Sequence, residues 1–179
     1  MPVNAETRII VADIPDEGLF LNYQGLEGFL VELDSDKRLV QGEGRLEITR
    51  TGQDVHVEGW VRAVVKLRCD RCLEDFDLQI ETDFFYLLKS PEEFRQELLP
   101  EQEVTEENVE EYWYEDGQIR ADDLFREQIL LKLPVRNLCR QSCKGLCPGC
   151  GADLNREKCR CPEPESDSPF AVLKGLLAT

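Results

Sequence analysis

The sequence predicts an α+β fold: an antiparallel β-sheet, with barrel-like closure left open, over about residues 7–90, followed by a packing helix and a cysteine-rich segment. Two observations predict it. Long runs of alternating apolar and polar residues occupy the first half of the chain, and one helical pattern precedes most of the cysteines. The 179 residues suffice for one domain with a small appendage. We expect a sheet domain over 1–134 and a basic zinc-knuckle segment over 135–179.

The longest alternation runs from Asp54 to Arg68 and predicts a half-buried strand. The apolar residues that share one face of this strand are Val55, Val57, Val61, Ala63, Val65 and Leu67. Residues 45–50 alternate in the same way and turn residues join the two runs, so the pair predicts a hairpin. Shorter strands are expected over 7–14 and 28–33.

A third alternating run, from Phe76 to Leu88, follows a break that contains Cys69 and Cys72. A short connection between two long strands makes an antiparallel pair. We therefore expect these two cysteines at a short, rigid tip of the sheet.

Residues 91–117 are strongly acidic, with Arg95 as the single basic residue. Blocks of like charge are usually solvated, so the segment predicts an acidic loop, with a binding tail as the alternative. The aromatic residues Tyr112, Trp113 and Tyr114 indicate that part of it packs.

A helix is predicted over 122–133, with Asp122 or Asp123 as its N-cap and Pro134 just beyond its end. We interpret Glu127 in this helix as solvated or locally paired rather than catalytic, because no partner can be identified. A short amphipathic helix is expected near the end of the chain, over 168–177.

The cysteines form the strongest motif in the chain. They are Cys69, Cys72, Cys139, Cys143, Cys147, Cys150, Cys159 and Cys161. A Cys-x2-Cys turn directs two thiolates at one ion, and two such elements close a tetrahedral zinc site. The preferred assignment places Cys147, Cys150, Cys159 and Cys161 on one structural Zn²⁺ and the other four on a second. One or two ions are expected, and the site that Cys143 joins is left open.

Other interpretations of the cysteines are weaker. Core cysteines would not be flanked by charged residues and glycine, and a disulfide framework suits an exported chain, whereas no export leader is visible here. A redox pair at Cys69 and Cys72 stays an alternative, although it lacks a strand-to-helix context. Closed four-sulfur sites hold no open position for water, so they predict structural zinc. The single histidine, His56, is expected on the surface.

The net charge of −16 predicts a surface that repels nucleic acid and anionic membranes, and we expect a cytoplasmic protein with no membrane or DNA partner. Residues 132–160 are the exception, with an excess of five positive charges. Candidates for local RNA or ribosome contact are Arg136, Arg140, Lys144, Arg156, Lys158 and Arg160. The chain lacks a phosphate-binding loop and a nucleophile elbow, so no enzymatic activity is expected.

Several segments, taken together and in order, resemble the YceD family of large ribosomal RNA subunit accumulation proteins. They are LRCDRCLEDF, DLFREQILLKLPV, CRQSCKGLCPGCGADLN with its trailing CRC, and SPFAVLKGLL. The resemblance implies a role in the synthesis, processing or stability of large-subunit ribosomal RNA, with no established catalytic activity. It also implies that the second cysteine cluster varies among members, so the second zinc is less central to the family.

The resulting hypothesis is a non-enzymatic ribosome-biogenesis factor whose partner is the large-subunit ribosomal precursor, through its RNA or a ribosomal protein. Two alternatives from other classes stay open. One is an acidic protein-interaction module, or chaperone, for a basic ribosomal protein, to which a −16 surface is suited. The other is a thiol redox protein that uses Cys69 and Cys72.

Overall fold

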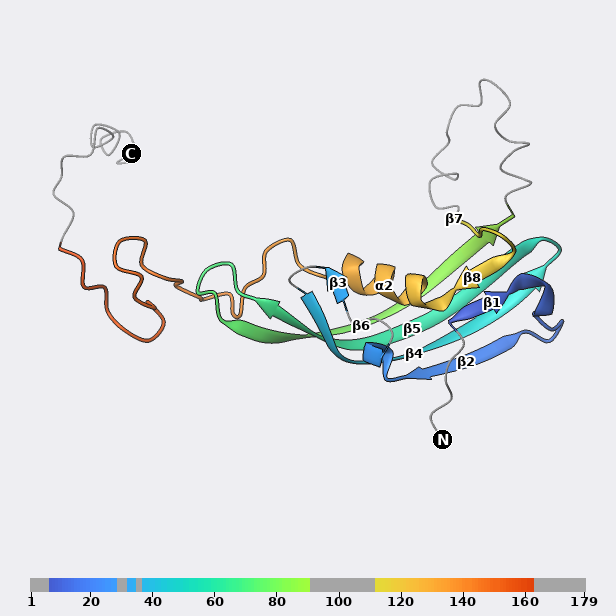
Figure 1. Ribbon diagram of the computed structural model, residues 1–179, viewed down its shortest axis with the longest axis horizontal. Coiled ribbons are helices and arrows are strands. Elements are labelled where there is room, and N and C mark those ends of the chain that lie inside the picture. Colours follow the sequence, from blue (N-terminus) through green and yellow to red (C-terminus); the bar gives the residue numbers. More distant parts are fainter. Residues whose placement is uncertain (1–6, 29–31, 35–36, 91–111, 163–179) are drawn as a thin grey trace, which may run out of the picture.

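The structure is a computed structural model that describes residues 7–28, 32–34, 37–90 and 112–162 (Figure 1). Most of the predicted acidic loop and the whole predicted helix over 168–177 lie outside these residues. In chain order the elements are β1 (Arg8–Ile10), the 3-10 helix η1 (Val11–Asp13), β2 (Leu19–Gln24), the 3-10 helix η2 (Leu26–Gly28), β3 (Glu32–Asp34), β4 (Lys37–Thr51), β5 (Asp54–Arg68), β6 (Asp75–Lys89), β7 (Tyr112–Trp113), β8 (Gln118–Arg120) and α2 (Ala121–Leu131).

The main sheet is built on three 15-residue strands, β4, β5 and β6, in consecutive antiparallel hairpins. Its order is β2-β4-β5-β6-β7, with β3 also paired to β4 and β7 parallel to β6, while β1 and β8 form a separate two-stranded sheet. The barrel-like closure left open by the sequence is not found. Among the described strands, β2 and β7 lie at opposite edges of an open sheet, and α2 covers one face instead (Figure 1).

Strand β5 has the predicted bounds, and its six predicted apolar residues are all buried. Alternation along a strand places every second side chain on the core face, which explains the agreement. Strand β4 begins eight residues before the predicted run. The alternation does not reveal these residues, because Gly42 and Gly44 interrupt the apolar pattern and a bulge between Leu39 and Gln41 shifts the register. Strand β2 was not predicted, and the strand expected over 7–14 is only β1 followed by η1.

Gly44 of β4 makes room for the helix. A Cβ atom on Gly44 would lie 2.5 Å from Cε1 of Phe125, a fully buried residue of α2. The Phe125 ring packs edge-on against Tyr23 of β2 and Phe84 of β6, with centroids 5.1 and 6.0 Å apart. One aromatic side chain of α2 therefore joins three strands of the sheet.

The predicted N-cap of this helix is wrong. The helix begins at Ala121, Arg120 stands at the N-cap position, and no side chain caps the first turn. Asp122 is instead held by Arg120, whose Nη2 lies 2.5 Å from Oδ2 of Asp122. The strand β8 runs directly into the helix, so Arg120 keeps extended geometry and the acidic residues fall inside the first turn.

Glu127 is locally paired, as predicted. The hydroxyl of Tyr86 donates to Oε2 of Glu127 at 3.1 Å and accepts from Nε2 of Gln128 at 2.7 Å. Burial raises the pKa of the Tyr86 hydroxyl above its usual range. Tyr112 packs edge-on against the same ring at 4.7 Å, so part of the aromatic run does pack.

No helix within the described ranges has the length and apolar character that a membrane span requires.

Candidate metal centres and the basic segment

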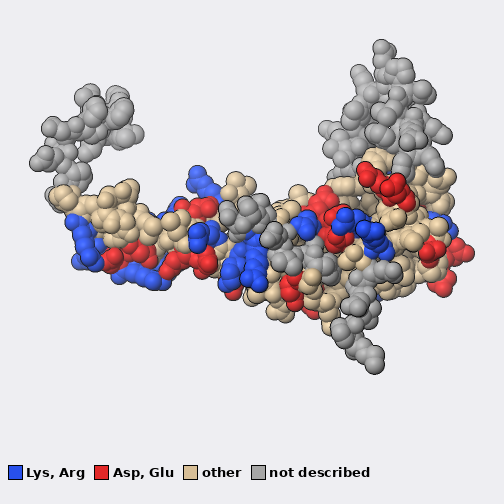
Figure 2. All heavy atoms as spheres, in the orientation of Figure 1, with Lys and Arg blue, Asp and Glu red and all other residues tan. Residues whose placement is uncertain are grey.

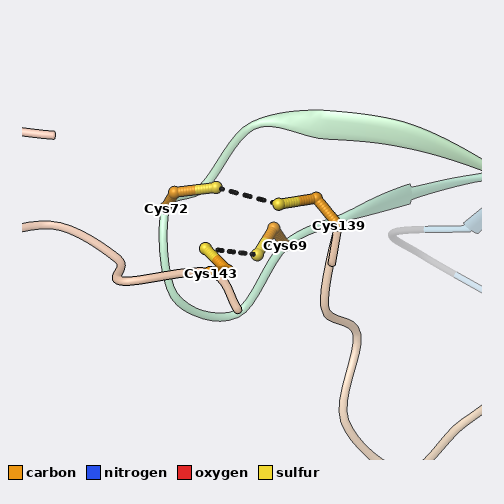
Figure 3. Close-up of side chains that lie close together, drawn as sticks. All are labelled: Cys69, Cys72, Cys139 and Cys143. Carbon is orange, nitrogen blue, oxygen red and sulfur yellow. Dashed lines mark hydrogen bonds between the residues drawn. The ribbon is translucent and has the colours of Figure 1, made fainter. Parts of the chain in front are cut away.

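The first cysteine group forms where the β5–β6 tip meets the chain that follows α2 (Figure 3). Cys69 and Cys72 lie in the tip, which is closed by a hydrogen bond from the Cys69 N–H to the Glu74 carbonyl at 2.9 Å. Cys139 and Cys143 approach from the other segment. Cys69, Cys72 and Cys143 are buried, and all four sulfurs lie within 4.8 Å of one another.

The sulfur geometry of the first group fits a tetrahedral ion. Zinc–sulfur bonds near 2.3 Å require sulfur–sulfur edges of about 3.8 Å in a regular tetrahedron. The Cys69–Cys143 sulfurs are 3.9 Å apart and the Cys72–Cys139 sulfurs 3.7 Å. These distances are far too long for disulfides, which need about 2.05 Å. The group could therefore hold one metal ion.

Hydrogen bonds that do not involve the cysteine sulfurs also join the two segments of this group. Asp70 and Asn137 exchange two hydrogen bonds of 2.8 Å: the Asp70 N–H donates to the Asn137 carbonyl, and the Asn137 N–H donates to Oδ2 of Asp70. The Arg71 guanidinium donates to the Cys143 carbonyl at 2.7 Å, and the Arg71 carbonyl accepts from the Leu146 N–H at 2.9 Å. The tip is thus bound to the cysteine-rich segment by hydrogen bonds of its backbone and side chains.

The second group consists of Cys147, Cys150, Cys159 and Cys161, whose sulfurs also lie within 4.8 Å of one another. The Cys147 sulfur is 3.3 Å from that of Cys159 and 3.7 Å from that of Cys161. Cys150 and Cys159 are exposed, in contrast to the buried sulfurs of the first group. Close packing leaves no room for a side chain at Gly149, where a Cβ atom would lie 2.7 Å from the Cys161 sulfur.

Backbone amides favour thiolates in both groups. Burial raises the pKa of the Cys69 thiol, but three backbone N–H groups, the strongest from Cys139, donate to its sulfur and together lower the pKa to about 6. In the second group the N–H groups of Arg160 and Ala152 lower the pKa of Cys150 to about 6. Hydrogen bonds to the charged form stabilise it. Each group therefore presents a thiolate near neutral pH, the form that binds metal.

The remaining thiols of each group resist ionisation when no cation is close. Burial, and then the sulfurs of its three neighbours, raise the pKa of Cys139 to about 12. The neighbouring sulfurs, that of Cys159 foremost, raise the pKa of Cys161 to about 12. A divalent cation at the centre would reverse this repulsion, because it favours every thiolate around it. Such donor sets suit a metal better than they suit free thiols.

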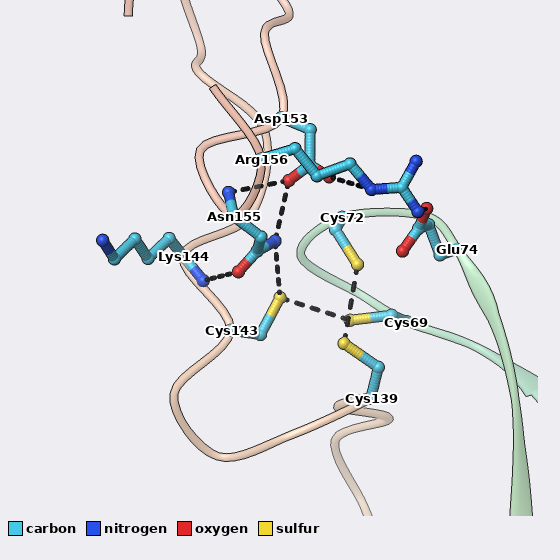
Figure 4. A network of polar contacts seen from close by, with 9 residues as sticks. All are labelled: Cys69, Cys72, Glu74, Cys139, Cys143, Lys144, Asp153, Asn155 and Arg156. Carbon is cyan, nitrogen blue, oxygen red and sulfur yellow. Dashed lines mark hydrogen bonds and ion pairs between the residues drawn. The ribbon is translucent and has the colours of Figure 1, made fainter. Parts of the chain in front are cut away.

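A polar network that the cysteine spacing did not reveal connects the loop carrying Asp153, Asn155 and Arg156 to the first group (Figure 4). Asn155 lies between Cys150 and Cys159 in the sequence, yet its Nδ2 lies 3.5 Å from the Cys143 sulfur of the first group. Its Oδ1 accepts from the Lys144 N–H at 2.8 Å, and Nδ2 donates to Oδ1 of Asp153 at 2.7 Å. No sequence pattern points to this role, because it depends on how the loop folds back.

The six basic candidates are all exposed, but two of them are already paired. Arg156 binds Asp153 at 3.4 Å and also contacts Glu74 of the tip, and Arg160 contacts Glu157. In the described part of the chain, the others form no ion pair; they are Arg136, Arg140, Lys144 and Lys158. Basic side chains are visible along the cysteine-rich end in Figure 2, with acidic ones between them. Contact with RNA stays a prediction for these residues.

Comparison with known proteins finds a matching family model. The model described as "Large ribosomal RNA subunit accumulation protein YceD" matches residues 57–177, which include all eight cysteines and α2. This span covers more than half of the chain.

Curated relatives agree with the family model. The chloroplastic YCED homolog 1 proteins of Arabidopsis thaliana and Zea mays are 26% and 27% identical over 156 and 152 residues, each match covering 73% of this chain. An uncharacterized protein of Mycobacterium tuberculosis (strain H37Rv) is 28% identical over 131 residues, 73% of this chain and 55% of that protein. The chain spans only about half of the two plant proteins, 47% and 52%. No solved structure gives a significant match. Since the family model matches residues 57–177, well over half of the chain, this chain belongs to the YceD family.

Proposed function

We propose that this chain is a non-enzymatic ribosome-biogenesis factor of the cytoplasm that supports the synthesis, processing or stability of large-subunit ribosomal RNA. The observation that carries the proposal is the match of residues 57–177 to a family described by that RNA. The proposed contact is made by the exposed basic residues around the two cysteine groups. Phosphate contacts by such residues would make binding salt-dependent.

The proposed metal is zinc, one ion in each group of four cysteines. Four sulfurs within 4.8 Å of one another, with edges near those of a Zn–S4 tetrahedron, support this choice. A site with four protein ligands has no open position for substrate, so the proposed ions are structural. In the proposal they hold the basic segment in one shape at the end of the sheet.

A redox role for Cys69 and Cys72 is less well supported. The Cys69 side chain has no exposed surface, although its pKa is lowered. A reactive thiolate needs access to its substrate. The low pKa is accounted for by the backbone N–H groups that a metal site also requires.

One observation favours a second candidate, a module that binds a basic ribosomal protein. Two of the six basic candidates, Arg156 and Arg160, are engaged with carboxylates of this chain, which reduces the charge available for RNA. The net charge of −16 suits a basic protein partner. The two candidates differ in which ligand they bind directly.

The first test uses two charge-matched double variants in sucrose gradients of cell extract at low and high salt. Arg140→Glu with Lys144→Glu reverses two exposed charges that directly follow Cys139 and Cys143 of the first group. Arg8→Glu with Arg50→Glu reverses two exposed charges elsewhere, and Arg50 lies at the opposite end of the sheet from the tip. We expect the first variant, but not the second, to leave the large-subunit precursor peak.

Equal behaviour of the two variants would reject the basic segment as the contact. If the wild-type chain remains at the top of the gradient at both salt concentrations, stable particle binding is rejected. Direct titration with naked large-subunit RNA and with purified basic ribosomal proteins then separates the two candidates. The Cys147→Ser variant tests whether the second group is needed for comigration.

A further inference from the structure

The face of the main sheet opposite α2 carries aromatic side chains. Phe20 of β2 and Phe85 of β6 are 51% and 56% exposed, and Trp60 of β5 is partly exposed between them. An open cavity of about 590 Å³ lies on this face. It is lined by Arg45, Glu47, Glu58, Gly59, Trp60, Asp83, Phe84 and Phe85. We give the name outer-face patch to Phe20 and these residues except Phe84, whose ring packs against Phe125 on the α2 side of the sheet. Exposed aromatic residues gathered on one surface indicate a binding site more often than scattered ones do.

Two arginines of the chain show how this face holds a cation. The Arg62 guanidinium lies 4.9 Å from the Trp60 ring centroid, while its Nε is 2.7 Å from Oε1 of Glu81. Arg45 lies 5.6 Å from the Phe20 ring centroid and 4.0 Å from Glu47. In both cases a guanidinium stacks on a ring and faces a carboxylate. Cation–π and ionic attraction act together in this arrangement.

The third ring, Phe85, has carboxylates beside it, and no cation from the described residues stacks on it. Glu58 is the direct cross-strand neighbour of Phe85, and Asp83 lies two residues before Phe85 on the same face of β6. Both carboxylates are exposed. Asp83 attracts Arg62 without contact, and no described cation lies within ion-pair distance of either carboxylate. Within the described ranges, the Phe85 ring contacts one other ring, that of His56, at 6.1 Å between centroids.

The charge pattern of the patch selects the partner. Glu47 and Glu58 face each other directly across β4 and β5, an unfavourable pairing for two like charges. Three carboxylates stand against one cation, Arg45, in the cavity lining. A partner that brings positive charge would relieve this repulsion, whereas the phosphates of RNA would increase it. An open sheet face also fits an extended segment whose alternate side chains reach it.

We propose that the outer-face patch binds an extended, arginine-rich segment of a partner protein, with one guanidinium stacked on Phe85 between Glu58 and Asp83. The site repeats the arrangement that Arg62 makes on Trp60. It depends on the sheet alone and not on the cysteine groups or the proposed RNA contact. The inference thus adds a protein-binding surface to the proposed function.

The test titrates the full chain with a labelled nine-residue peptide that alternates arginine with serine. A peptide of the same length with citrulline in place of arginine keeps the shape and removes the charge. We expect binding of the arginine peptide, weakened by salt, and none of the citrulline peptide. Phe85→Ala and Glu58→Gln should each weaken binding about two- to fivefold, in line with exposed cation–π and ionic contacts.

Three controls make the result specific. Phe85→Trp keeps an aromatic face and should retain binding, and Glu115→Gln removes an exposed charge between β7 and β8 and should have no effect. The Arg140→Glu, Lys144→Glu variant should bind the peptide as wild type does, which separates this site from the RNA contact. Circular dichroism checks that each variant is folded.

The proposal is overturned if Phe85→Ala and Glu58→Gln bind the arginine peptide as wild type does. The proposal would also be overturned if Glu115→Gln weakened peptide binding equally, because binding would then depend on the net charge of the chain and not on the patch. The proposal is also overturned if the chain binds a single-stranded RNA oligonucleotide and Phe85→Ala weakens that binding. In that case the ring stacks bases rather than a guanidinium.

Discussion

The side-chain amide of Asn155 lies 3.5 Å from the sulfur of Cys143 and so connects the loop of the second cysteine group to the first. The same side chain accepts from the Lys144 N–H at 2.8 Å. Asn155 therefore links the two groups structurally. We expect a change in the loop that carries Asn155 to alter the packing around the buried Cys143 sulfur. Hydrogen bonds to a metal-bound sulfur also orient the ligand.

Replacing Asn155 with alanine should destabilise the cysteine-rich segment. The change removes the contacts to Cys143, Lys144 and Asp153, and we expect a loss of about 1–2 kcal/mol. For a chain of this size the melting temperature should fall by about 3–6 °C. Asn22→Ala, at an exposed position of β2, is the control and should leave the melting temperature unchanged. Equal melting curves for Asn155→Ala and wild type would contradict the coupling.

Removing one sulfur from each group should have unequal effects. Cys72→Ser acts at a buried group that joins the β5–β6 tip to the chain beyond α2, whereas Cys161→Ser acts at a group with exposed members. We expect each variant to lose about one zinc per chain by elemental analysis. The melting temperature should fall further for Cys72→Ser, by about 6–12 °C for a loss of about 3 kcal/mol. The two substitutions are chemically identical, so each serves as the control for the other. Unchanged metal content in both would refute the metal sites.

Zinc binding should release protons and should weaken as the pH falls. At pH 7 the lowered pKa of Cys69 makes it a thiolate, while the raised pKa of Cys139 keeps its proton until a cation arrives. Binding must displace that proton, so affinity rises with pH. Calorimetry of zinc binding in two buffers of different ionisation enthalpy measures the number released. We expect at least one proton per ion, and a result of zero would contradict the thiol assignment.

Gly44→Ala should disturb the packing of α2 on the sheet. The added Cβ would lie 2.5 Å from Cε1 of Phe125 and 2.9 Å from the Trp60 carbonyl oxygen, so the helix must shift. Overpacking of this kind costs about 1–3 kcal/mol. Gly28→Ala is the matched control, because no atom of the described residues lies within 4 Å of its Cβ position. Chemical denaturation should show a lower unfolding free energy for Gly44→Ala only, and a stable Gly44→Ala variant would mean that α2 is not held as described.

Much of the sheet could be predicted because strand alternation is a local property. The run from Asp54 to Arg68 places six apolar side chains on one face whatever else the chain does. Its hairpin partner was predicted only in part, since Gly42 and Gly44 lack the side chains that display the pattern. Gly44 accommodates Phe125 of α2 and Gly42 accommodates Leu26 of η2, and both contacts join residues that are distant in sequence.

The sequence by itself indicated β5 and β6, part of β4, and the tip that holds Cys69 and Cys72. It also indicated two groups of cysteines, with the group of Cys143 left open until the structure gathered two sets of four. Local periodicity and short ligand spacing carry that information. Only the tertiary structure decided that the sheet stays open, that Asn155 reaches Cys143 and that Arg156 is paired with Glu74. Only strand register placed Phe85 beside Glu58. These relationships join residues far apart in sequence, so they follow from packing and register, which no local pattern specifies.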